Sequence, residues 1–378
     1  MKEESSNRFD DKEFRAWLAL SHINISTQKL LHFFEHYSSI SDLFELSEKQ
    51  LSQLGFRQGL KQRLNAISED TIDRDITWFD SANKHLIPFT SDDYPALLRE
   101  VDSAPKLLFV HGNKELLKQH QIAIVGSRNP TPQGKDNAIE FARTLGKAGA
   151  VITSGLALGV DGYAHQAVLD IGLPTIAVAG TGLDRVYPAR HKVMAQQIVE
   201  QGAMVSEFAL GTGVRATHFP ARNRIISGLS LGTLVVEAAV KSGSLITARL
   251  AMEQGREVFA IPGSIHNPLA RGCHALIKQG VKLVETAEEI IEELSALVTW
   301  QNETLFKTLD DTTSEAVQFE LDDEYQELIK HIDFDVTPMD KIVERSGLEI
   351  DVVSHMLLLL ELNDHIVSVA GGYQRRSS

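Results

Sequence analysis

The stretch that decides the fold is Ile122-Ala123-Ile124-Val125-Gly126-Ser127-Arg128, a short apolar run that ends in a glycine turn. From this point the chain repeats one order: an apolar run, a turn that often begins with glycine, and an amphipathic stretch with helical periodicity. The later apolar runs are residues 150–153, 175–179, 234–236, 258–261 and 282–284. Such alternation is typical of βαβ units, so the sequence predicts an α/β domain with a parallel sheet.

Four turns follow these runs and mark the expected functional edge of the sheet. They are residues 126–128, 155–161, 180–182 and 242–244. Ligands of open α/β sheets bind outside the carboxyl ends of the strands, and glycine lets backbone amides approach an anion closely. No turn has the G-x-G-x-x-G or P-loop spacing, which disfavours a nucleotide cofactor. We therefore predict several phosphate-binding positions in a row.

A stretch with two arginines, Phe219-Pro220-Ala221-Arg222-Asn223-Arg224, precedes the apolar residues Ile225 and Ile226. We interpret the apolar residues as the start of a buried strand. The two arginines then form an anion-binding group, because guanidinium groups match phosphate oxygens in a bidentate way. The alternative is a pair of surface arginines with carboxylate partners.

Taken together, these segments resemble the DprA family, also called Smf, the bacterial DNA-processing proteins of natural transformation. The resemblance extends from Ile87 to Leu294 and rests on several ordered motifs. They are residues 126–128, 155–161, 180–184 with 187–188, 219–227, 237–247, 260–263 and 272–273. The resemblance implies an extended Rossmann-like domain that binds single-stranded DNA, forms a homodimer, and delivers the strand to the RecA recombinase.

Two positions depart from the family pattern. Gln133 stands where the family usually has an aromatic residue, so no base stacking is expected from this position. Ala189 stands where a lysine is common, with Arg190 and Lys192 close behind. We expect these two cations to extend the path of the phosphates.

The predicted DNA-binding residues combine cationic side chains, backbone amides and an aromatic ring. They are Gly126, Ser127, Arg128, Gly155, Gly159, Gly180, Arg190, Lys192, Phe219, Arg222, Asn223, Arg224, Gly243 and Ser244. Binding through the phosphates leaves the bases facing outward or stacked on Phe219 and Tyr187, with little sequence preference. We predict no catalytic residue, no metal site and no cofactor.

The rival interpretation is a nucleotide-binding or nucleotide-cleaving enzyme. A similar sheet occurs in the lysine-decarboxylase-like phosphoribohydrolases, which need a P-G-G-x-G-T-x-x-E loop. The counterpart here, residues 242–247, is followed by Ala248-Arg249-Leu250 and lacks the glutamate. Glu237 and Asp161 remain near the strand ends, where we expect them to orient an arginine or to cap a helix.

The net charge of −14 is distributed unevenly. Residues 122–282 contain 16 Lys and Arg against 10 Asp and Glu, whereas the rest of the chain contains 21 against 41. The positive charge is therefore concentrated where the glycine turns lie, and it can attract a polyphosphate strand. The single cysteine, Cys273, excludes a disulfide framework. With no leader-like N-terminus and no apolar run of about 18 residues, we expect a cytoplasmic protein without membrane insertion.

The sequence suggests four parts. They are an all-helical, SAM-like domain at 1–80, the Rossmann-like DNA-binding domain at 83–295, an acidic and polar linker at 296–322, and a winged-helix-like domain at 323–378. Residues 283–378 contain 6 Lys and Arg against 22 Asp and Glu, so phosphate would repel the last domain. We expect it to contact protein or to shield the basic face. In the first domain, the loop at 22–26 lacks the glycines of a DNA-binding hairpin, which favours a protein contact or a packing role.

Overall fold

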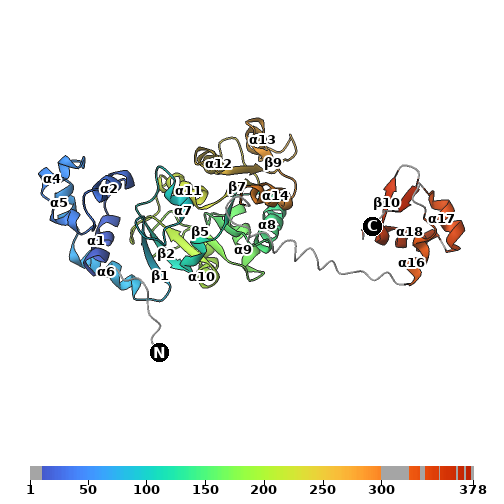
Figure 1. Cartoon of the computed structure of the whole chain (residues 1–378), viewed down its shortest axis with the longest axis horizontal. Coiled ribbons are helices and arrows are strands. Elements are labelled where there is room, and N and C mark those ends of the chain that lie inside the picture. Colours follow the sequence, from blue (N-terminus) through green and yellow to red (C-terminus); the bar gives the residue numbers. More distant parts are fainter. Residues whose placement is uncertain are drawn as a thin grey trace, which may run out of the picture. The chain divides into compact units, whose positions relative to one another are not determined.

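The computed structural model describes residues 11–298, 323–332, 337–348, 350–362, 365–369 and 372–375. The chain divides after residue 306 into two compact units (Figure 1). Of the predicted linker at 296–322, only residues 296–298 are described, as the end of helix α14 (Ala287–Val298). None of the described helices is both long and apolar enough to span a membrane.

The first unit is built on a nine-stranded sheet with the order β1-β2-β6-β5-β4-β3-β7-β8-β9. The strands are β1 (Lys84–Pro88), β2 (Leu107–Gly112), β3 (Gln121–Val125), β4 (Val151–Ser154), β5 (Thr175–Val178), β6 (Ala203–Ser206), β7 (Gly232–Val235), β8 (Glu257–Ala260) and β9 (Lys282–Leu283). Strands β3 to β9 pair in parallel, while β1 and β2 extend the sheet in antiparallel fashion beside β6. The predicted α/β fold is confirmed.

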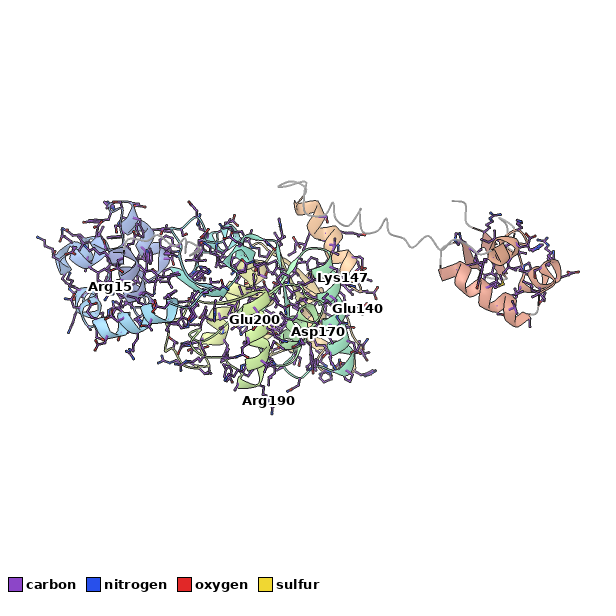
Figure 2. All side chains as sticks on the ribbon, turned by 90° about the horizontal axis from the view of Figure 1, so that it is seen from below. Arg15, Glu140, Lys147, Asp170, Arg190 and Glu200 are labelled. Carbon is purple, nitrogen blue, oxygen red and sulfur yellow. The ribbon has the colours of Figure 1, made fainter. Side chains whose placement is uncertain are left out.

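Helices cover both faces of the sheet. One face is covered by four helices that pack together: α8 (Pro132–Lys147), α9 (Val160–Leu169), α10 (Lys192–Gln201) and α14. The other face is covered by α7 (Ala96–Arg99), α11 (His218–Leu229) and α12 (Gly243–Glu253), which also pack together. Helix α13 (Arg271–Lys278) contacts β8. Glu140, Lys147 and Asp170 are exposed side chains of the first layer (Figure 2). The central strands β3 to β7 are buried on both sides, which explains why they are largely apolar runs.

The predicted strand after Arg224 is wrong, because Ile225 and Ile226 lie in the middle of α11. A short apolar run does not by itself distinguish a buried strand from a buried helix. In a helix, residues at spacings of three and four share one face, so Arg222 lies on the same face as Ile225, Ile226 and Leu229. All four residues are buried.

The strand order places a crevice at the functional edge. From β3 the chain continues to its neighbour β4 on one side, and from β7 it continues to β8 on the other. The carboxyl ends of β3 and β7 are therefore the topological switch point, where ligands of open α/β sheets bind.

Six short helices precede the sheet between residues 11 and 79, in agreement with the predicted all-helical N-terminal region. They are α1 (Asp11–Ser21), α2 (Thr27–Phe34), α3 (Asp42–Glu45), α4 (Glu48–Gln53), α5 (Leu60–Asn65) and α6 (Glu69–Phe79). Their apolar side chains join one continuous core with those of the sheet. The Trp17 ring, for example, lies edge-on to Phe89 with 6.0 Å between the ring centroids. The boundary at residue 80 stays a prediction.

The sheet ends at β9, which has two residues, both of them exposed. Lys282 of this strand forms an ion pair with Glu293 of α14.

The described residues of the second unit have the predicted order of three helices and a hairpin. Its elements are α16 (Asp323–Ile329), α17 (Met339–Ser346), α18 (Ile350–Leu362), β10 (Ile366–Val369) and β11 (Gly372–Arg375). The two strands pair antiparallel. Leu328, Ile342 and Leu357, one from each helix, meet in a small apolar core. This is the architecture of a winged helix.

Candidate functional site

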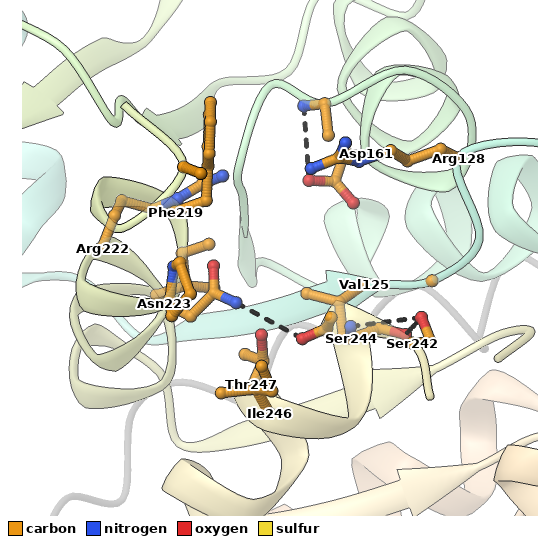
Figure 3. A pocket seen from close by; sticks show the side chains of 16 residues that line it. Val125, Arg128, Asp161, Phe219, Arg222, Asn223, Ser242, Ser244, Ile246 and Thr247 are labelled. Carbon is orange, nitrogen blue, oxygen red and sulfur yellow. Dashed lines mark hydrogen bonds between the residues drawn. The ribbon is translucent and has the colours of Figure 1, made fainter. Parts of the chain in front are cut away.

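A cavity of about 540 Å³ lies at the carboxyl ends of β3 and β7, at the switch point of the sheet (Figure 3). The turn after β3, the turn after β4, the first half of α11 and the start of α12 form its walls. The structure brings seven of the predicted site residues together here: Gly126, Arg128, Phe219, Arg222, Asn223, Gly243 and Ser244.

Two buried side chains of opposite charge, Arg222 and Asp161, line this cavity. Arg222 is only 4% exposed, and its Nη1 donates to the carbonyl oxygen of Val178 at 2.8 Å. Asp161, also buried, is the opposing charge. Burial lowers the pKa of Arg222 to about 10, although Asp161 counteracts this effect. Burial raises the pKa of Asp161, and Arg222 opposes that shift. At neutral pH Arg222 therefore keeps its positive charge.

Gly155 has a different role from the predicted one. Its amide donates to Asp161 Oδ2 at 3.0 Å, so in this structure it is not presented to a ligand. A Cβ atom at this position would lie 1.8 Å from Nη1 of Arg222. Glycine is therefore required here because the guanidinium group packs directly against the backbone.

Arg128 and two aromatic rings form the exposed part of the site. Arg128 is exposed, and its guanidinium carbon lies 5.8 Å from the centroid of the Phe219 ring. The Tyr187 ring lies 5.6 Å from Phe219 on centroids, and Gly180 leaves room for Phe219 to pack against its backbone. Within the described residues Arg128 has no carboxylate partner. An available cation thus stands beside an aromatic platform, an arrangement that suits a nucleotide.

The start of α12 supplies the second polar wall. Ser242 caps the helix, and its side chain accepts from the amide of Ser244 at 3.3 Å. The Asn223 side chain donates to the carbonyl oxygen of Gly243 at 3.4 Å, which connects α11 to this turn (Figure 3). A helix N-terminus carries partial positive charge and free amides, so it favours an anion in the cavity.

Arg224 lies outside the cavity, which corrects its predicted place beside Arg222 at an exposed edge. Both of its terminal nitrogens donate to the carboxylate of Glu207 at 2.6 Å, and its Nε donates to the carbonyl oxygen of Ser103 at 2.9 Å. Its side chain is 16% exposed. Arg224 therefore fits the alternative interpretation, an arginine with a carboxylate partner. Two positions along a helix separate residues onto different faces, so the side chains of Arg222 and Arg224 point in different directions.

Ser127 and Gly159 position the cavity walls without lining the cavity. Gly159 has a φ of 81°, and a Cβ atom there would lie 2.3 Å from the carbonyl oxygen of Ser127. The same oxygen accepts from the amide of Val160 at 3.1 Å. These contacts hold the turn after β3 against the start of α9, next to Arg128.

The two remaining cations of the prediction are exposed and lie beside the 3₁₀ turn Ala189–His191. Arg190 projects from the surface of the unit (Figure 2). Lys192 begins α10 and borders a different cavity. Neither residue lines the main cavity, so a role for them stays a prediction.

Glu237 holds the start of α8, a role that the sequence left open. The buried carboxylate accepts from the amide of Thr131 at 2.9 Å, from its hydroxyl at 2.6 Å, and from the Asn267 side chain at 3.3 Å. A Cβ atom at Gly134 would lie 2.4 Å from its carboxylate carbon. The glycine that follows Gln133 therefore makes room for this capping carboxylate.

Two family models match this chain. The family model of the DNA recombination-mediator protein A matches residues 85–295, and that of the DprA winged helix domain matches residues 312–372. Protein Smf of Escherichia coli is 44% identical over 326 residues, 86% of either chain.

Two solved structures of DNA processing protein A are also similar. The Streptococcus pneumoniae protein has a TM-score of 0.66 and 38% identity over 74% of this chain and 97% of its own. The Helicobacter pylori protein, described for a single-stranded DNA binding mode, has a TM-score of 0.50 and 33% identity over 53% of this chain and 92% of its own. With more than half of its length matched by the family model, this chain belongs to the DNA recombination-mediator protein A family.

Proposed function

We propose that this protein binds single-stranded DNA at the main cavity and acts as a recombination mediator. The observation that carries the proposal is the exposed Arg128 beside the Phe219 ring, at a cavity that the start of α12 also borders. The Helicobacter pylori relative, described for its single-stranded DNA binding mode, supports it.

The geometry suggests how a strand is held. Arg128 and the start of α12 bind phosphates, while Arg222, whose charge faces that of Asp161, adds a guanidinium group to the cavity wall. A base can stack on Phe219 only when it is unpaired, which favours a single strand over a duplex. Because every base has a π-face, such stacking gives little sequence preference.

The family membership supports two further parts of the proposal. A strand that is held through its phosphates leaves its base edges free to pair, so it can be protected and then passed to a recombinase of the RecA type. We also propose that two copies associate through the α/β unit. Both parts describe a protein that acts in the cytoplasm, where recombination takes place.

Both carboxylates that an enzymatic function could use, Glu237 and Asp161, already have partners within the protein. Glu237 accepts three hydrogen bonds at the start of α8, and Asp161 faces Arg222 and accepts from the amide of Gly155. A nucleotide-cleaving enzyme needs a carboxylate directed at the glycosidic bond. We therefore expect no base release from nucleoside monophosphates.

Fluorescence anisotropy with labelled oligothymidylate, a hairpin duplex and nucleoside monophosphates as competitors tests the proposal. Affinity for the single strand should exceed that for the duplex. It should also fall with salt, with a log–log slope of magnitude about 2–4, since each phosphate neutralised on a single strand contributes about 0.7. A flat salt dependence or a preference for the duplex would contradict it, and release of free base would favour the enzyme.

A further inference from the structure

A second cavity, of about 730 Å³, lies between the N-terminal helices and the loops that follow β5 and β6. Its walls include Arg74 and Trp78 of α6, Arg185 of the turn after β5, and Arg215 and His218 at the approach to α11. None of these residues belongs to the DNA contacts predicted from the sequence. Cationic side chains from three different parts of the chain line this cavity.

The two cavities share a wall, formed by residues 215–219, which we call the ridge. Ala216 and Phe219 of the ridge line the main cavity, and Arg215 and His218 line the second one. The ridge leads into the first turn of α11, where the N-cap residue Thr217 makes no side-chain cap. A linear polymer stacked on Phe219 therefore has to cross only this ridge, past the partly positive start of a helix, to reach the second cavity.

The carboxylates in the second cavity are already engaged. Asp75 is buried, and its Oδ2 lies 2.6 Å from Nε2 of His22. Asp184 accepts from Arg185 at 2.7 Å through one oxygen and from the amide of Gly211 at 3.0 Å through the other. Arg185 thus offsets the charge of Asp184, and the buried Asp75 is hydrogen-bonded to His22.

Two guanidinium groups in the cavity have no such engagement. Arg74 donates to neutral partners, the carbonyl oxygen of Asp70 and the hydroxyl of Thr71, both at 3.1 Å. Arg215 is exposed, and in the described part of the chain neither arginine forms an ion pair. Exposed guanidinium groups that lack a carboxylate are available to phosphate oxygens, which they match in geometry.

We propose that the second cavity binds the continuation of the same single strand, with Arg74 and Arg215 contacting phosphates beyond the ridge. The inference rests on the proposed function, because the strand enters from the main cavity. The shared wall favours a linear polyanion over a separate small anion. The N-terminal helices thus take part in binding through α6, not through the loop at 22–26.

The contributions of the two cavities to binding can be distinguished by the length of the oligonucleotide. Oligothymidylates of about 4 and about 16 nucleotides, the limits of common single-strand site sizes, are titrated against full-length protein. The Arg74→Ala/Arg215→Ala variant should bind the longer strand about tenfold more weakly and lower its salt slope by about 1.4, for two phosphates lost. Its affinity for the shorter strand should not change. Arg57→Ala/Arg63→Ala removes the same charge from exposed N-terminal positions outside both cavities and should leave both affinities unchanged.

The outcomes distinguish the two proposals. Suppose that Arg128→Ala weakens the binding of both oligonucleotides while the Arg74→Ala/Arg215→Ala variant binds like the wild type. The second cavity is then not part of the binding path, and the proposed function stands. An equal loss in the Arg57/Arg63 control would likewise overturn the inference, because net charge alone would explain it. If Arg128→Ala changes neither affinity, the proposed function itself fails. Thermal unfolding of each variant confirms that it is folded.

Discussion

Arg222 and Arg224 stand two positions apart in the sequence, yet only Arg222 lines the main cavity, while Arg224 is paired with Glu207. The sequence correctly indicated that Arg128, Phe219 and Arg222 gather at one sheet edge. It could not distinguish Arg222 from Arg224, because both lie in one stretch and only the helical geometry of α11 separates them. The ion pair of Arg224 joins it to Glu207, a residue 17 positions away that no local pattern connects with it.

This difference predicts opposite effects for two arginine variants. Arg128→Ala should weaken binding of single-stranded DNA about tenfold, about 1.4 kcal/mol. As an exposed residue it should change the free energy of unfolding by no more than about 0.5 kcal/mol. Arg224→Ala should instead lower that free energy by about 1–3 kcal/mol, because the Glu207 carboxylate loses its partner.

Urea unfolding and DNA titration of both variants check this prediction, and each variant is the control of the other. If the Arg224→Ala protein is stable but has lost DNA binding, Arg224 contacts DNA and the structural role is contradicted. A destabilised Arg128→Ala protein would show that Arg128 has a structural role.

At the scale of elements, the parallel strands were predictable and the antiparallel extension was not. Strands β3, β4, β5, β7 and β8 are apolar runs in a repeating βαβ order. Strands β1 and β2 pair antiparallel and stand outside that order. Strand β6, Ala-Met-Val-Ser, has few residues that favour strands and is specified by its neighbours in the sheet.

The cap of α8 gives a prediction for an element. Glu237→Ala should lower the free energy of unfolding by about 1–3 kcal/mol, because the partly buried amide and hydroxyl of Thr131 lose their acceptor. Glu237→Gln keeps one acceptor oxygen and should lose less. Glu140→Ala, an exposed change on the same helix, should stay within about 0.5 kcal/mol.

Chemical denaturation of the three variants measures these differences. Equal stability of Glu237→Ala and Glu140→Ala would show that the carboxylate does not hold the helix. A nucleoside assay on Glu237→Ala separately reports whether the residue has any role in base release.

At the scale of the whole molecule, the chain combines a basic centre with acidic flanks. Residues 299–378 contain 6 Lys and Arg against 17 Asp and Glu. The compact unit that ends before residue 307 contains both cavities. Composition alone was enough to predict the separation of charge, since it depends on counting and not on contacts.

Removing the acidic end should therefore leave DNA binding intact. A protein of residues 1–298 should bind oligothymidylate with the affinity of the full chain, or slightly more tightly at low salt, because repulsion of the phosphates decreases. Parallel titrations at low and physiological salt measure this. A tenfold loss of affinity, about 1.4 kcal/mol, would show that the winged helix contributes a DNA contact despite its charge.

The short strand at the end of the sheet limits how another strand can pair with this edge. With two residues in β9 and the Lys282–Glu293 ion pair beside them, this edge offers almost no backbone ladder to an incoming strand. Short, charged edges are a common protection against uncontrolled sheet extension and fibril growth. Self-association at this edge would then depend on side-chain packing, and a single surface substitution could separate two copies without disturbing either sheet.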